Sequence, residues 1–97
     1  MKQFKNLDFR TFFNSLQNES KAILIDVRSS REYSLDHAKN AINFDVLKPD
    51  QKKKLFQMSP EHSFYLYCSS GGRSAVIAQE MVNQGFEKVY NLKDGIH

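Results

Sequence analysis

Short apolar runs alternate with amphipathic segments along this chain of 97 residues. Two continuous runs rich in β-branched and aromatic residues, Ala22–Val27 and Ser63–Cys68, are typical of strands buried on both faces. The shorter runs at residues 41–46 and 88–92 predict two further brief strands. The pattern of apolar positions therefore predicts a sheet of short, mostly buried strands.

Segments between these runs predict helices. They are residues 8–19, which Asp8 can cap, residues 50–58, which Pro60 closes, and residues 74–84, which end at Gly85. Ser29 and Ser30 are candidate N-caps of a further short helical turn. Because strands and helices alternate at short intervals, we predict an α/β fold, a small parallel sheet flanked by helices on both faces.

The composition indicates one small globular domain over residues 1–97. Of these residues 40% are hydrophobic, enough for a modest core, and no repeat or linker interrupts the chain. No segment approaches the roughly 20 apolar residues that a membrane span needs. Charged residues interrupt the apolar positions of "MKQFKNLDFR", so no secretory signal is expected. We therefore expect a cytoplasmic location and no membrane partner.

The charge and the cysteine count narrow the possible classes further. The net charge is only +3, and its one cluster, Lys52–Lys54, is typical of a solvated helix face rather than a nucleic-acid interface. The single cysteine, Cys68, excludes an internal disulfide and a thiolate cluster for zinc. We therefore predict no nucleic-acid partner and no metal site, and any role of Cys68 is that of a thiol.

The position of Cys68 is the strongest chemical signal in the chain. It ends a predicted buried strand and precedes a helix, and ligands of parallel sheets gather at the carboxyl ends of strands. The intervening residues are small enough for their amides to converge into an anion-binding nest, to which the helix start adds positive potential. Arg73 is a candidate cation for an oxyanion, and Ser74 a hydrogen-bond donor or helix cap. This arrangement lowers the pKa of a thiol, so we favour a nucleophilic cysteine over a buried inert one.

Two blocks of the sequence resemble the single-domain rhodaneses. The run "CSSGGRS" is similar to the family's active-site loop. In that loop a glycine stands three residues after the cysteine, an arginine five residues after it and a hydroxyl residue six residues after it. Upstream, "LIDVRSSREYSLDHAKNAINF" resembles the second signature, with an aspartate-x-arginine, a glutamate-aromatic pair, a histidine and alanine-isoleucine-asparagine. The order and separation of the blocks also match, so the resemblance covers nearly the whole chain.

The resemblance implies a thiosulfate sulfurtransferase that works by double displacement. Cys68 would take the outer sulfur of a small anion such as thiosulfate, hold it as a persulfide and pass it to a thiophilic acceptor such as cyanide or a thiol. No metal or organic cofactor is implied. The expected substrate-binding residues are those of the loop: Ser69, Ser70, Gly71, Gly72, Arg73 and Ser74.

Asp26 and Arg28 match the family's aspartate-x-arginine. We expect Asp26 at the end of a strand beside the cysteine loop, in a structural ion pair rather than in catalysis. His37 is expected to pack structurally, and Glu32 and Tyr33 to anchor the short helix.

The sequence departs from the family pattern at three places. Asp36 replaces a glycine before the histidine, a change expected to alter a turn without touching the chemistry. Gly72 replaces a basic or polar loop residue, and "LKDGIH" lacks the usual glycine pair and tryptophan. The second departure predicts weak thiosulfate binding, and the third predicts an incomplete carboxyl-terminal edge of the pocket.

Three alternatives to this function remain. The first is a protein phosphatase, but such loops place five residues between cysteine and arginine, whereas four lie between Cys68 and Arg73, a cradle better suited to sulfur. The second is a persulfide relay that docks on partner proteins and takes sulfur from a protein persulfide donor. The third is a binding domain without catalysis. The sequence does not separate the relay from the thiosulfate enzyme, because both use the same chemistry.

Overall fold

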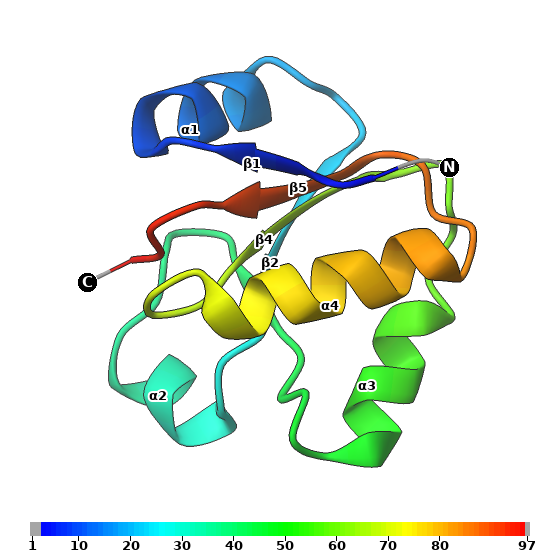
Figure 1. Ribbon diagram of the computed structural model, residues 1–97. Coiled ribbons are helices and arrows are strands. Elements are labelled where there is room, and N and C mark those ends of the chain that lie inside the picture. Colours follow the sequence, from blue (N-terminus) through cyan, green and yellow to red (C-terminus); the bar gives the residue numbers. More distant parts are fainter. Residues whose placement is uncertain (1–2, 97) are drawn as a thin grey trace.

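The computed structural model describes residues 3–96 as one parallel sheet with helices on both faces (Figure 1). The strands are β1 (Lys5–Leu7), β2 (Ala22–Asp26), β3 (Ile42–Asn43), β4 (Ser63–Tyr67) and β5 (Val89–Leu92). The helices are α1 (Phe9–Gln17), α2 (Ser30–Leu35), α3 (Pro49–Phe56) and α4 (Gly72–Asn83). The strand order is β1-β5-β4-β2-β3, and every pairing is parallel. The predicted α/β class is confirmed.

The central strand β4 supplies side chains to two cores. All five of its residues are buried, and successive side chains of a strand point to opposite faces. Tyr65 and Tyr67 pack on the side of α1, whereas Phe64 and Leu66 pack on the side of α3 and α4. Figure 1 shows α1 on one side of the sheet and α3 and α4 on the other, with α2 near the loop that leads into α4.

Helix α1 is fixed at its start and at its centre. The carboxylate of Asp8 accepts a hydrogen bond from the Thr11 amide at 2.8 Å, so the predicted cap is confirmed. Phe12 is fully buried, and its ring meets that of Tyr65 edge to face with centroids 5.2 Å apart. These contacts hold α1 against the sheet.

Several element boundaries differ from the sequence-based expectations. The strand predicted at residues 41–46 is confined to β3, and β1 was not predicted because its three residues are polar or partly exposed. Helix α3 spans Pro49–Phe56 rather than residues 50–58. Helix α4 begins at Gly72, two residues earlier than predicted, because the left-handed Gly71 directly before it ends the loop. Ser29 is confirmed as the N-cap of α2, whereas Ser30 is its first helical residue.

The register of the sheet brings two predicted site segments together. Asp26 ends β2 and is the partner of Tyr67, which ends β4. Arg28 comes two residues after Asp26, and Cys68 directly follows Tyr67. The expected position of Asp26 beside the cysteine loop is therefore confirmed. Among the described residues, no helix is long and apolar enough to span a membrane.

Candidate active site

The Cys68 sulfur lies at the centre of a small nest of donors. Its Sγ accepts hydrogen bonds from the Gly71 amide at 3.1 Å, the Ser74 amide at 3.4 Å and the Ser74 hydroxyl at 3.3 Å. The amides come from the loop and from the first turn of α4, the positive end of that helix. Positive dipoles therefore converge on one sulfur atom, as the sequence led us to expect.

The balance of these contacts favours the thiolate. Burial raises the pKa of the Cys68 thiol, but hydrogen bonds from the hydroxyl and amide of Ser74 and from the amides of Ser70 and Gly71 outweigh it. The pKa of Cys68 is therefore lowered from its usual value. The Cys68 side chain is fully buried in this conformation, so the loop must move before a reagent can reach the sulfur.

Glycine is required at two places around the nest. Gly71 has a φ of +93°, and a Cβ there would lie 2.0 Å from the Lys93 carbonyl oxygen. Gly95 has a φ of +74°, and its Cβ would lie 2.3 Å from the Ser69 carbonyl oxygen. The turn after β5 therefore presses directly on the cysteine loop.

The start of α4 is also held from the edge of the sheet. Asn91, a buried residue of β5, donates from Nδ2 to the Gly71 carbonyl at 3.3 Å and to Oδ1 of Asn6 in β1 at 2.9 Å. The Ser74 hydroxyl oxygen lies 3.3 Å from this carbonyl oxygen and 3.3 Å from Sγ, so the two acceptors share its one proton. The peptide that carries the nest is thus tied to β5 and, through it, to β1.

Arg73 is paired with Glu32, and its side chain remains 38% exposed. Its Nη1 and Nη2 donate to Oε1 and Oε2 of Glu32 at 2.7 and 2.9 Å, a bidentate pair. The same carboxylate accepts from the Ser69 hydroxyl at 3.1 Å and caps α2 together with Ser29. The pKa of Glu32 is lowered, and the largest cause is the hydrogen bond from Arg73. The hydrogen bonds from Ser29 and Ser69 act in the same direction, whereas burial opposes them.

Asp26 and Arg28 form a second bidentate pair. The Arg28 guanidinium donates from Nε at 3.1 Å and from Nη2 at 2.8 Å to the fully buried carboxylate. The Tyr67 hydroxyl also donates to this carboxylate, at 2.6 Å. The pKa of Tyr67 is raised to about 12, mainly by burial and to a smaller extent by this hydrogen bond. The ion pair that we expected here is present.

A cavity of about 500 Å³ lies next to the cysteine loop. It is lined by Arg28, Asp36, His37, Ser69, Ser70 and Ile96. His37 stacks on the Tyr33 ring with centroids 3.7 Å apart, and its Nδ1 lies 2.7 Å from the Tyr33 carbonyl oxygen. Because His37 is exposed and lines the cavity, its packing role stays a prediction. Ile96 donates from its amide to the Cys68 carbonyl at 2.9 Å. The carboxyl-terminal edge of the pocket, expected to be incomplete, is formed by Ile96, and His97 lies outside the described residues.

The comparisons with known proteins agree with this site. The family model of the rhodanese-like domain matches residues 10–97. The chain belongs to the rhodanese-like family. Membership supports sulfur transfer or a related enzyme activity for this domain.

Solved rhodanese-like structures share the fold. A rhodanese-like domain protein from Staphylococcus aureus superposes with a TM-score of 0.77 at 23% identity, over 95% of this chain and 87% of the other. The human single-domain sulfurtransferase TSTD1 gives a TM-score of 0.73 at 21% identity, over 95% of this chain and 90% of the other. At these identities the likeness concerns the rhodanese-like fold alone.

Curated relatives of this rhodanese-like chain carry another name. A tRNA uridine(34) hydroxylase of Buchnera aphidicola (subsp. Acyrthosiphon pisum, strain Tuc7) is 36% identical over 87 residues, which are 86% of this chain and 27% of the relative. The protein of the same name from Legionella pneumophila (strain Paris) is 34% identical over 82 residues, 80% of this chain and 32% of the relative. The chain thus spans about a quarter to a third of the length of these relatives.

The rhodanese-like site contains most of the predicted residues, but not all of them in contact with the sulfur. Gly71 and Ser74 touch Sγ, whereas Ser69 binds Glu32, and Gly72 has open space around it. Asp26 and Arg28 lie beside the loop in their own pair. Sequence reasoning missed Tyr67 and the link from Glu32 to Arg73. The sequence pattern indicates only that Glu32 anchors the short helix.

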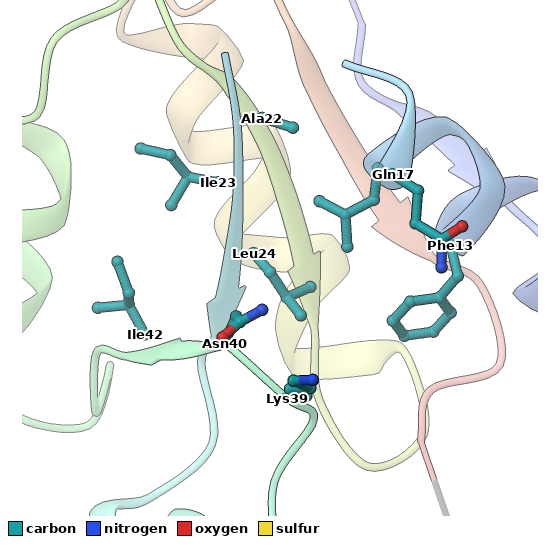
Figure 2. Close-up of a pocket in the computed structure, with 9 residues that line it drawn as sticks. Phe13, Gln17, Ala22, Ile23, Leu24, Lys39, Asn40 and Ile42 are labelled. Carbon is teal, nitrogen blue, oxygen red and sulfur yellow. The ribbon is translucent and has the colours of Figure 1, made fainter. Parts of the chain in front are cut away.

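A second cavity of about 500 Å³ lies away from the thiol, between α1 and β2. Figure 2 shows Phe13 of α1 and Leu24 of β2 on its walls, with Lys39 and Asn40 nearby. None of the predicted site residues lines it. Within residues 3–96, no group of three or more His, Cys, Asp or Glu side chains is placed to hold a metal ion.

Replacing Ser74 by alanine is expected to make the Cys68 thiol less acidic. The change removes the hydroxyl that donates to Sγ, so the thiolate form loses a stabilising bond and the pKa rises. The pH profile of alkylation by iodoacetamide should move to higher pH. Below its midpoint the rate should fall by about threefold, as the loss of one modest hydrogen bond implies.

Ser70→Ala is the matched control for this experiment. Ser70 contributes to the thiolate through its backbone amide, which alanine retains, and no hydrogen bond of its hydroxyl occurs within residues 3–96. Its alkylation profile should therefore match that of the unchanged protein. Coincident profiles for Ser74→Ala and Ser70→Ala would contradict the assigned role of the Ser74 hydroxyl.

Proposed function

We propose that this chain is a sulfurtransferase that carries a sulfane sulfur as a persulfide on Cys68. The observation that carries the proposal is the set of three donors on Sγ, from Gly71 and Ser74. They stabilise an anion on Sγ and so favour the nucleophilic thiolate. The family membership of residues 10–97 supports the same chemistry.

The first half-reaction loads the cysteine. The Cys68 thiolate attacks the outer sulfur of a donor such as thiosulfate, the new bond joins Sγ to that sulfur, and the sulfur–sulfur bond of the donor breaks. Its electron pair leaves on sulfite, and the negative charge of the thiolate passes to the outer sulfur of the persulfide. No external oxidant or reductant is consumed, because the sulfur moves in the sulfane state.

The second half-reaction returns the free enzyme. A thiophilic acceptor such as cyanide attacks the outer persulfide sulfur, thiocyanate leaves, and the electron pair returns to Sγ as thiolate. In this scheme the donor is bound by the loop, Ser69 to Ser74, with Arg73 oriented by Glu32. Asp26 and Arg28 support the loop from β2 and do not touch the reacting sulfur.

The direct test of the proposal is the intact mass of the protein after incubation with thiosulfate. We expect the addition of one sulfur, about 32 Da, which a thiol reductant or cyanide removes. Protein whose Cys68 has first been alkylated should gain nothing. An unchanged mass with thiosulfate and with an alkyl persulfide alike would contradict the proposal.

A second candidate function comes from the curated relatives, which are named tRNA uridine(34) hydroxylases. The identity of 36% over 86% of this chain favours a shared domain. In this alternative the domain contributes to an activity on tRNA that resides in a protein about four times as long. Binding of the purified chain to tRNA that persists at about 150 mM salt would favour it, since nonspecific phosphate contacts weaken steeply there.

A further inference from the structure

Both arginines near the thiol are already neutralised by carboxylates. Arg28 is paired with Asp26 and Arg73 with Glu32, each through two N–H donors. Their guanidinium groups therefore offer a substrate anion much less attraction than two free cations would. Among the residues that line the cavity, Arg28 is the only arginine or lysine.

Asp36 adds a negative charge to the same cavity. It follows the end of α2, it is exposed, and it lines the cavity together with Ser69 and Ser70. Its backbone carbonyl accepts from Arg28 Nη2 at 2.5 Å, which fixes the residue next to that guanidinium. Within residues 3–96, no hydrogen bond or ion pair reaches the Asp36 carboxylate. The negative charge of Asp36 therefore has no partner among these residues.

We propose that Asp36 selects the sulfur donor by its charge. It disfavours dianions such as thiosulfate and favours persulfides in which the sulfane sulfur is bound to an uncharged group. This inference rests on the proposed sulfur transfer. The charge of Asp36 repels each charge that the donor carries, and thiosulfate carries two. The persulfide of an alkyl thiol presents at most one at its reacting end.

The favoured loading step balances without a further reactant. The Cys68 thiolate attacks the terminal sulfur of R–S–SH, the bond from Sγ to that sulfur forms, and the bond between the two sulfurs of the donor breaks. The electron pair leaves on R–S⁻, the thiolate of the donor, and the proton remains on the transferred sulfur. The leaving group is a thiolate and needs no oxyanion-binding cation, unlike sulfite.

The experiment compares Asp36→Asn with the unchanged protein on two donors of the same chemistry and different charge. Thiosulfate is a dianion and methanethiosulfonate a monoanion, and both transfer a sulfane sulfur. In Asp36→Asn we expect kcat/KM for thiosulfate to rise about threefold or more, and that for methanethiosulfonate to rise by a smaller factor. The rise of thiosulfate kcat/KM with added salt should also be less steep in the variant, because one repulsive charge is gone.

Asp50→Asn is the matched control, since it removes the same charge from the exposed first turn of α3, outside the cavity lining. It should change neither donor by more than the error of the assay. Equal factors for both donors in Asp36→Asn, or equal effects of the two variants, would overturn the role of Asp36. A failure of every donor to load Cys68 in the intact-mass experiment would instead overturn the proposed function.

Discussion

Cys68→Ser is expected to lower the rate of thiocyanate formation by at least about a thousandfold, the scale seen when a covalent nucleophile is removed. The serine hydroxyl ionises far above neutral pH, and the oxygen–sulfur product of its attack cannot act as a persulfide. The measurement is the thiocyanate assay with cyanide, at donor concentrations well above and well below KM. Intact mass under the same conditions should show no added sulfur.

The folded structure should survive this change, so the loss can be assigned to chemistry. Serine is close to cysteine in size, and its Oγ can accept from the Gly71 amide that binds Sγ at 3.1 Å. Thermal unfolding and circular dichroism therefore serve as controls for the fold. A residual rate within about tenfold of the unchanged protein would mean that Cys68 is not the sulfur carrier, since nucleophile removal costs far more.

Gly71→Ala is expected to destabilise the protein by about 3 kcal/mol and to abolish most of its activity. Alanine is strained at the φ of +93°, and its Cβ would lie 2.0 Å from the Lys93 carbonyl oxygen, so the backbone must shift. That shift moves the amide that binds the cysteine sulfur. Denaturant unfolding measures the first effect and the thiocyanate assay the second.

The adjacent glycine provides the control for this prediction. Gly72 is the first residue of α4, and a Cβ there would have no heavy atom within 4 Å. Gly72→Ala keeps the backbone amide through which this residue would bind the donor, so activity should be intact. Stability should be unchanged or raised by up to about 1 kcal/mol, the gain of alanine over glycine in a helix. Equal losses in the two variants would show that the steric contact of Gly71 is not what shapes the loop.

Much of the fold could be predicted from local sequence because its strongest signals are local. Strand β4 is buried on both faces, so its sequence is a continuous apolar run, which predicts a buried strand directly. Asp8 and Ser29 are confirmed caps because an N-cap depends only on residues two or three positions away. The edge strand β1 lacks such a signal, since its pairing with β5 is formed by residues more than 80 positions away.

The candidate site could be predicted in part for the same reason. The nest around Cys68 is made by residues within six positions of it, so the loop sequence already indicates it. The partners of Arg73 and Asp26 come from other elements. Glu32 is 41 residues from Arg73, and Tyr67 is 41 residues from Asp26. No local pattern indicates these pairs, and they decide how much positive charge the site retains.

The amide of Asn91 has a consequence for where this domain begins. The family match starts at residue 10, after β1, yet Asn6 of that strand accepts from the same amide group that holds the Gly71 carbonyl. A fragment trimmed to the matched residues would keep every atom near the sulfur and lose one anchor of the peptide that positions it. Strand β1, at the edge of the sheet, therefore helps to position the peptide that binds the thiolate.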